Sequence, residues 1–112
     1  MGGSIQRLRG KAAYRRAADA AIKKPINSVL PAITGTKTQG QTLTCSSGTW
    51  TNSPTYAYQW NRDGVPIAGA TASTRVLALA DVGGLMTCTV TATNAGVSTA
   101  ATSLPTTAIV GS

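Results

Sequence analysis

The chain has 112 residues, with ten Lys or Arg, three Asp, no Glu, no His and no Phe, and its formal net charge is +7. A chain of this length has room for one small domain with a modest hydrophobic core. Because histidine and glutamate are missing and the three aspartates are scattered, there is no obvious general base, paired-carboxylate site or metal-ligand cluster. We therefore predict a protein that is not an enzyme and that carries no cofactor and no metal.

The first segment, from Ser4 to Lys24, is rich in alanine, arginine and lysine, which favours a helix by intrinsic propensity. Its apolar residues form no continuous stripe, because charged residues fall among them around the helix. We expect this helix to be frayed when free and ordered when docked. It should end at Lys24, since the residue before Pro25 is disfavoured in the helical region, and residues 25–31 are expected to form an extended linker.

Positive charge is concentrated at this end of the chain. Residues 1–30, which we call the basic arm, hold seven cationic residues and one anionic residue, a net charge of +6. Residues 31–112 hold three cationic and two anionic residues, a net charge of +1. A near-neutral domain with a cationic extension implies an anionic partner. The residues of the basic arm that we predict to make this contact are Arg7, Arg9, Lys11, Tyr14, Arg15, Arg16, Lys23 and Lys24.

Three kinds of anionic partner are open to the basic arm: nucleic acid, a membrane surface and an acidic protein surface. The arm has no apolar stripe and no Trp or Phe to insert, so we predict no membrane partner. Tyr14 is its only aromatic residue, so it has no ladder of rings on which bases could stack, and nucleic acid is the weaker candidate. Alanine pairs at 12–13 and 17–18 favour close packing against a protein surface instead.

From Ala32 onward the sequence changes to short alternating runs of Thr, Ser, Val and Gly, spaced about every ten residues as in an all-β sandwich. Between two of the runs, Asp63-Gly64 predicts a tight hairpin, because both central residues of the favoured turn need positive φ. We predict seven strands, at residues 32–34, 41–46, 56–62, 65–68, 74–79, 85–94 and 97–103.

Side chains in a strand alternate between its two faces, so each run also predicts which residues lie inside. Along the run 85–94, the threonines at 87, 89, 91 and 93 fall on the outer face, which we interpret as a solvated sheet surface built from good strand formers. We predict inward positions for Leu43, Cys45, Tyr58, Trp60, Leu77, Leu79, Met86, Cys88, Val90 and Ala92.

A single tryptophan, Trp60, lies between Cys45 and Cys88, which are 43 positions apart. This order is typical of immunoglobulin-like β-sandwiches, and we predict that the three residues form the structural core. Two states of the cysteines remain open: a disulfide, or two buried thiols that pack as small apolar groups. Because the N-terminus lacks the apolar core of a secretory signal, we expect synthesis in the cytoplasm and oxidation only after cell lysis.

Seven short phrases follow one another between Pro31 and about Ser103. They are Ile33-Thr34-Gly35, Gly40-Gln41-Thr42-Leu43-Thr44, Gly48-Thr49-Trp50, Tyr58-Gln59-Trp60, Ile67-Ala68-Gly69-Ala70-Thr71, Ala80-Asp81-Val82-Gly83 and Val90-Thr91-Ala92-Thr93-Asn94. In this order they resemble the immunoglobulin-like repeats of bacterial and bacteriophage surface proteins. The resemblance implies the fold more specifically than the function. Met86 departs from the wider family, in which a tyrosine at this position braces a sheet corner.

A single domain of this kind behind a short basic arm resembles a head decoration protein of a tailed bacteriophage. The resemblance implies that the arm docks on the major capsid protein or another virion protein, while residues 31–112 are displayed outward. It also implies weak adhesion to host surface glycans, with Trp50 and Tyr56 as candidate sugar platforms, although Trp50 is better suited to packing over a sandwich edge. The expected location is therefore the virion. The alternatives are a carbohydrate-binding or adhesion module on a phage tail or cell surface, and a nucleic-acid-associated protein that uses the arm.

Overall fold

The computed structural model describes residues 24–112, and their regular structure is β apart from one turn of 3-10 helix. The all-β class predicted from the sequence is therefore confirmed for this part of the chain. The predicted helix lies outside the described residues, apart from its last position. In chain order the elements are β1 (Asn27–Val29), β2 (Ile33–Thr34), β3 (Thr42–Cys45), β4 (Thr49–Trp50), β5 (Thr55–Arg62), β6 (Val65–Pro66), β7 (Thr74–Val76), η1 (Leu79–Asp81), β8 (Met86–Asn94) and β9 (Val97–Thr102).

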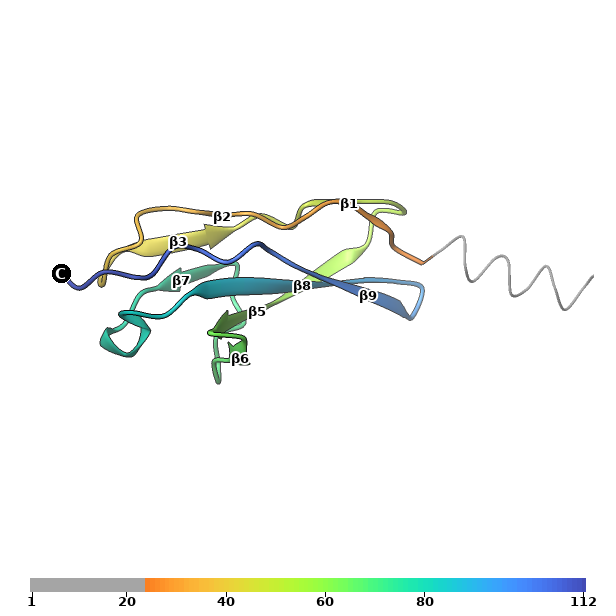
Figure 1. Cartoon of the computed structure of the whole chain (residues 1–112). Coiled ribbons are helices and arrows are strands. Elements are labelled where there is room, and N and C mark those ends of the chain that lie inside the picture. Colours follow the sequence, from red (N-terminus) through yellow and green to blue (C-terminus); the bar gives the residue numbers. More distant parts are fainter. Residues whose placement is uncertain (1–23) are drawn as a thin grey trace, which may run out of the picture.

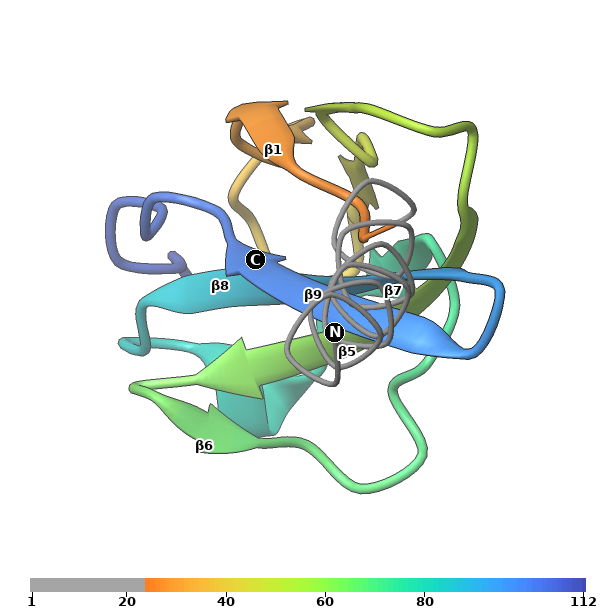
Figure 2. The ribbon, with the colours of Figure 1, turned by 90° about the vertical axis from the view of Figure 1, so that its right-hand side faces the viewer.

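The strands form two main sheets in a sandwich-like arrangement (Figure 1). One sheet has the order β2-β3-β7 and the other has the order β6-β5-β8-β9, while β1 and β4 form a separate pair. These pairs are all antiparallel. Seen along the long axis, β1 and β6 lie on opposite sides of the molecule, with β8 and β9 between them (Figure 2).

The longest ladder runs through β5, β8 and β9. β5 pairs with β8 over eight residues, from Thr55 opposite Thr93 to Arg62 opposite Met86, and β8 pairs with β9 over six. Along β8, buried and half-buried residues alternate, because apolar side chains occupy the inner positions and threonines the outer ones. Both residue types suit a pleated, half-buried surface. The threonines at 87, 89, 91 and 93, which the sequence places on the outer face, are the half-buried residues of this pattern.

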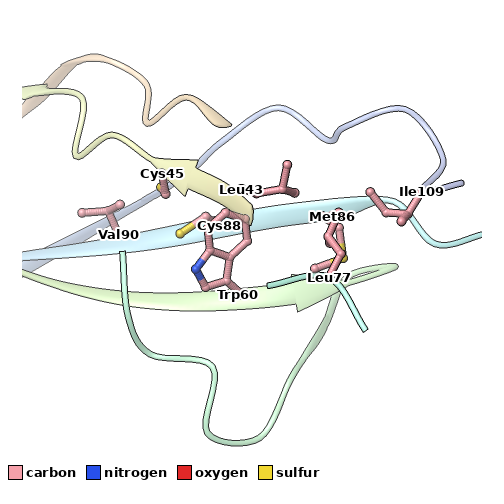
Figure 3. Close-up of a cluster of buried hydrophobic side chains, with 8 residues drawn as sticks. All are labelled: Leu43, Cys45, Trp60, Leu77, Met86, Cys88, Val90 and Ile109. Carbon is pink, nitrogen blue, oxygen red and sulfur yellow. The ribbon is translucent and has the colours of Figure 1, made fainter. Parts of the chain in front are cut away.

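Eight buried side chains fill the interior between the sheets (Figure 3). Trp60 is the largest of them, and its indole Nε1 donates a hydrogen bond of 2.8 Å to the carbonyl of Ala72. This bond satisfies the one polar atom of the ring, as a buried tryptophan requires. The members are Leu43, Cys45, Trp60, Leu77, Met86, Cys88, Val90 and Ile109.

The segment after β9 continues along β8 and then reaches the far end of the sandwich. The N–H of Ser103 donates to the carbonyl of Cys88 at 3.0 Å, and that of Thr106 donates to the carbonyl of Met86 at 2.9 Å. Further on, Val110 forms a parallel bridge with Thr38, and Ile109 forms another with Val82. The C-terminus therefore lies at the end of the molecule opposite to the entry of the chain near Lys24 (Figure 1).

Two short strands were not predicted. Residues 25–31, expected to be a linker, contain β1, which pairs with β4. Pro25 is buried, and the carbonyl of Ile26 accepts a hydrogen bond of 3.0 Å from the N–H of Thr51. Strands of two or three residues are too short to show the alternation on which the prediction depended. The folded body therefore begins before Pro31. The change in sequence character predicts a later start, at about Pro31.

One inward prediction is wrong: Leu79 is 73% exposed. β7 ends at Val76, and the chain then turns through η1, so the period of two no longer assigns its faces. The residue of η1 that points inward is Asp81, which has no exposed surface. The hairpin predicted at Asp63-Gly64 is confirmed, since both residues have positive φ and join β5 to β6.

Candidate functional site

The described residues contain few groups that could carry chemistry. No three His, Cys, Asp or Glu side chains gather closely enough in residues 24–112 to hold a metal ion. Over the same residues, no helix is both long enough and apolar enough to cross a bilayer. The features that remain are a buried cysteine pair, a buried aspartate with two arginines, two aromatic rings near one end, and a groove between the sheet edges.

Cys45 on β3 and Cys88 on β8 are buried, free thiols beside Trp60 (Figure 3). They share a hydrogen bond that lowers the pKa of Cys45 and raises the pKa of Cys88, which burial raises further. The thiol of Cys45 also lies 3.2 Å from the carbonyl oxygen of Ser46. A thiol pair enclosed in this way has no path to a substrate, so its chemistry is confined to packing or to bonding with itself.

Sequence reasoning missed a charged cluster at one corner of the sandwich. Buried Asp81 accepts a hydrogen bond of 2.9 Å from Nη1 of Arg62 on β5, and bonds of 3.1 and 3.2 Å from Nη2 and Nε of Arg75 on β7. Its Oδ2 also accepts the backbone N–H of Ala78 at 2.9 Å. Because β5 and β7 belong to different sheets, this carboxylate ties the two sheets together.

The same contacts decide the protonation of Asp81. Burial by itself would raise the pKa of this carboxyl, but hydrogen bonds from Ala78, Arg75 and Arg62 outweigh burial and lower the pKa below its usual value. Asp81 is therefore ionised at neutral pH and acts as a structural anion. A signal was available in the sequence, since residues 31–112 hold only five charged side chains and three of them meet here.

Trp50 and Tyr56, the predicted sugar platforms, differ in accessibility. Trp50 on β4 is half-buried against the core cluster, and its indole Nε1 donates a hydrogen bond of 2.6 Å to the carbonyl of Ser47. Tyr56, near the start of β5, is 40% exposed. Glycan contact stays a prediction, and Tyr56 is the more accessible ring of the two.

Of the predicted contact residues in the basic arm, the structure describes Lys24. Its side chain is exposed, and its carbonyl accepts a hydrogen bond of 3.2 Å from Nδ2 of Asn52, in the turn between β4 and β5. The next residue, Pro25, is buried. The junction between arm and sandwich is thus anchored to this turn. Arg7, Arg9, Lys11, Tyr14, Arg15, Arg16 and Lys23 lie outside the described residues.

The outer face of the longest ladder is polar and internally bonded. Nδ2 of Asn61 donates to the hydroxyls of Thr87 and Thr89 at 3.2 Å each, and the hydroxyls of Thr89 and Thr102 lie 2.9 Å apart. These hydroxyl groups therefore already have partners within the sheet.

A groove of about 600 Å³ opens between residues 29–33 and residues 104–107, with Lys37 also in its lining. Sequence reasoning could not find it, because its two walls are far apart in the chain and meet only through the fold.

No protein-family model matches the chain, and no curated protein matches it either. The resemblance to immunoglobulin-like repeats of bacterial and phage surface proteins therefore depends on the seven phrases quoted above. What that resemblance implies about function enters below as a proposal.

Proposed function

We propose that this chain is a non-enzymatic structural protein of a bacteriophage virion, a capsid decoration protein that docks through its basic arm and displays the sandwich outward. The observation that carries the proposal is the unequal division of charge, with a net charge of +6 in residues 1–30 and +1 in residues 31–112. The chain enters the sandwich at the end opposite to the C-terminus (Figure 1). Attachment through the arm would leave both sheets and the far end free for display.

We further propose that the sandwich is immunoglobulin-like. The strand order supports this, with β2-β3-β7 in one sheet and β6-β5-β8-β9 in the other. So does the packing of Trp60 beside one cysteine from each sheet. Met86, at the position of the corner tyrosine, is buried and offers no hydroxyl. The contacts of Asp81 with Arg62 and Arg75 brace this corner in its place.

The composition of the basic arm suits an acidic protein surface. Four of its seven cations are arginines, at positions 7, 9, 15 and 16. The planar guanidinium group can form two parallel hydrogen bonds with one carboxylate, which gives such a contact direction as well as charge. A capsid surface with exposed carboxylates is therefore the kind of partner that fits the arm.

The test is co-sedimentation of the full-length protein with capsids stripped of it, using a variant in which the four arm arginines are changed to glutamine. We expect the affinity for the capsid to fall by at least about tenfold, because each charge-assisted contact contributes on the order of 1 kcal/mol or more. The matched control loses the same net charge on the exposed surface of the sandwich. Its four substitutions are Thr36→Glu, Gln41→Glu, Thr71→Glu and Ala100→Glu.

Capsid binding that is unchanged in the arm variant, or weakened equally in both variants, contradicts docking through the arm. A parallel titration with duplex DNA separates the nucleic-acid alternative. Neutralisation of seven phosphates would give a slope of log affinity against log salt near about −6. Capsid docking should instead saturate at a fixed ratio of this protein to capsid subunits.

A further inference from the structure

The groove between residues 29–33 and 104–107 is an apolar surface left open to solvent. Its volume of about 600 Å³ is within the range of known ligand sites, roughly 300–1,000 Å³. Two Leu-Pro pairs stand on its opposite walls, Leu30-Pro31 and Leu104-Pro105. Leu104 is 74% exposed, and Val29 and Leu30 are exposed as well. Exposed apolar residues gathered around a groove mark an interaction site more often than isolated ones do.

The groove lies between the open edges of the two sheets. β2 is the outer strand of one sheet, and residues 104–107 continue from β9, the outer strand of the other. Within the described residues, the backbone N–H and C=O of Leu104 make no hydrogen bond. Such an edge can pair with an added extended chain. Pro31 and Pro105 lack an N–H group, which limits the number of backbone bonds and gives side-chain contacts a larger share of the recognition.

Lys37 gives the groove its charge. It is half-buried, and among the described residues it is the one charged side chain of the lining. It forms no ion pair with Asp63, Asp81 or the C-terminus. Its carbonyl accepts a hydrogen bond of 2.9 Å from the N–H of Val110, which holds its backbone in place beside the C-terminal segment. A negatively charged group on an occupant of the groove would therefore be attracted to Lys37.

We propose that this groove binds an extended segment of a partner polypeptide that carries aliphatic side chains and a carboxylate facing Lys37. A polypeptide is favoured over a simple aliphatic ligand because it can also pair with the free backbone groups of Leu104. The chain's own basic arm fits poorly, since its net charge of +6 would be repelled by Lys37. The proposal is independent of capsid docking through the arm.

The experiment follows backbone amide signals of the full-length, isotope-labelled protein by NMR during titration with three probes. The first is an acetylated, amidated hexapeptide of valine, threonine, leucine, threonine, valine and glutamate. The second has lysine in place of the glutamate, and the third is decanoate. We expect the glutamate peptide to shift the amides of Val29, Ala32, Ile33, Leu104 and Thr107 in a saturable way, with weaker effects from the other two probes.

Two variants and one control sharpen the result. Lys37→Glu should reverse the preference between the two peptides, by about two- to fivefold on each side, as expected for a partly exposed ion pair. Leu104→Asp should weaken binding by about tenfold, because it removes apolar contact surface from the wall. Leu79→Asp is the matched control, since Leu79 is equally exposed at 73% but does not line the groove. The Leu79→Asp variant should bind the glutamate peptide with the same affinity as the unaltered protein.

Three outcomes would overturn the proposal. The first is the absence of saturable shifts at the groove with the glutamate peptide at millimolar concentration. The second is equal binding of the two peptides, or a preference that Lys37→Glu leaves unchanged. The third is tighter binding of decanoate than of the glutamate peptide, which would make the groove a site for small amphiphiles.

Discussion

The sandwich has one closed region and one open region. In the closed region, β3, β5 and β8 enclose Trp60 and the cysteine pair, and the ladder between β5 and β8 extends over eight residues. In the open region, β1 and β4 form a pair of three and two residues, and the neighbouring groove leaves Leu30 and Leu104 exposed. The difference indicates that stability is concentrated in the first region, so the second is free to vary and to bind. That division can be tested at the cysteine pair, at Asp81, at Gly48 and at the two tryptophans.

The largest effect should come from joining Cys45 to Cys88. Unfolding the protein in urea and refolding it in the presence of diamide should form this disulfide and raise the free energy of unfolding by about 4 kcal/mol, because the disulfide closes a long loop in the unfolded chain. Urea unfolding of the oxidised and reduced forms measures the gain, and intact mass shows the loss of two hydrogens. Cys45→Ser is the control, and the same treatment should not raise its free energy of unfolding, because Cys88 alone cannot close the loop. An oxidised form that is less stable than the reduced one would contradict the prediction.

Asp81→Asn should lower the free energy of unfolding by about 3 kcal/mol at pH 7, because it leaves Arg62 and Arg75 without their buried anion. The lowered native pKa means that the ionised form stabilises the fold above the unfolded pKa of about 3.9. That contribution is lost as pH falls below this value and through the native pKa. Urea unfolding at pH 7 and pH 3 should therefore show a large difference between variant and unaltered protein that shrinks in acid.

Asp63→Asn provides the control for this comparison. Asp63 is exposed, and its carboxylate accepts one hydrogen bond of 2.9 Å from the N–H of Leu85. Its replacement should cost less than about 1 kcal/mol. Equal losses at the two aspartates would show that the corner cluster contributes no more than an ordinary turn.

Gly48→Ala tests whether a single residue of the open region is important for stability. Gly48 has a φ of 78°, and a methyl group there would overlap the carbonyl oxygen of Val29 in β1. Gly40 has a similar φ of 85° with open space around it. We expect losses of about 2–3 kcal/mol for Gly48→Ala and about 1 kcal/mol for Gly40→Ala. Hydrogen exchange of the β1 amides should accelerate in the first variant only, and equal exchange in both would contradict the expected overlap.

The two tryptophans give the smallest and most direct comparison. Trp60→Phe should lower the free energy of unfolding by about 2 kcal/mol, because it leaves a cavity and an unpaired carbonyl at Ala72. Trp50→Phe should lower it by less than about 1 kcal/mol, because Trp50 is half-buried. Chemical unfolding of both variants gives the two values. A larger loss of unfolding free energy for Trp50→Phe than for Trp60→Phe would contradict the prediction that stability is concentrated in the closed region.

The closed region could be predicted from the sequence because its signals are local. Alternation along residues 85–94 assigned the inner face of β8, and Asp63-Gly64 located a hairpin by its demand for positive φ. The open region could not be predicted, because β1 and β4 are too short to show a period. The partners of Asp81 and the walls of the groove depend on contacts between distant segments. The inward prediction for Leu79 is wrong for a related reason, because a turn of 3-10 helix lies where the alternation assumed a strand.

The position of the last residues has a mechanical consequence. Ile109 and Val110 are held by parallel bridges to Val82 and Thr38, at the end of the molecule opposite to Lys24. A force applied between Lys24 and the C-terminus would pull these bridges along the strand direction, so their hydrogen bonds would have to break together and not one after another. Tension at this end of the sandwich would therefore load both bridges at once.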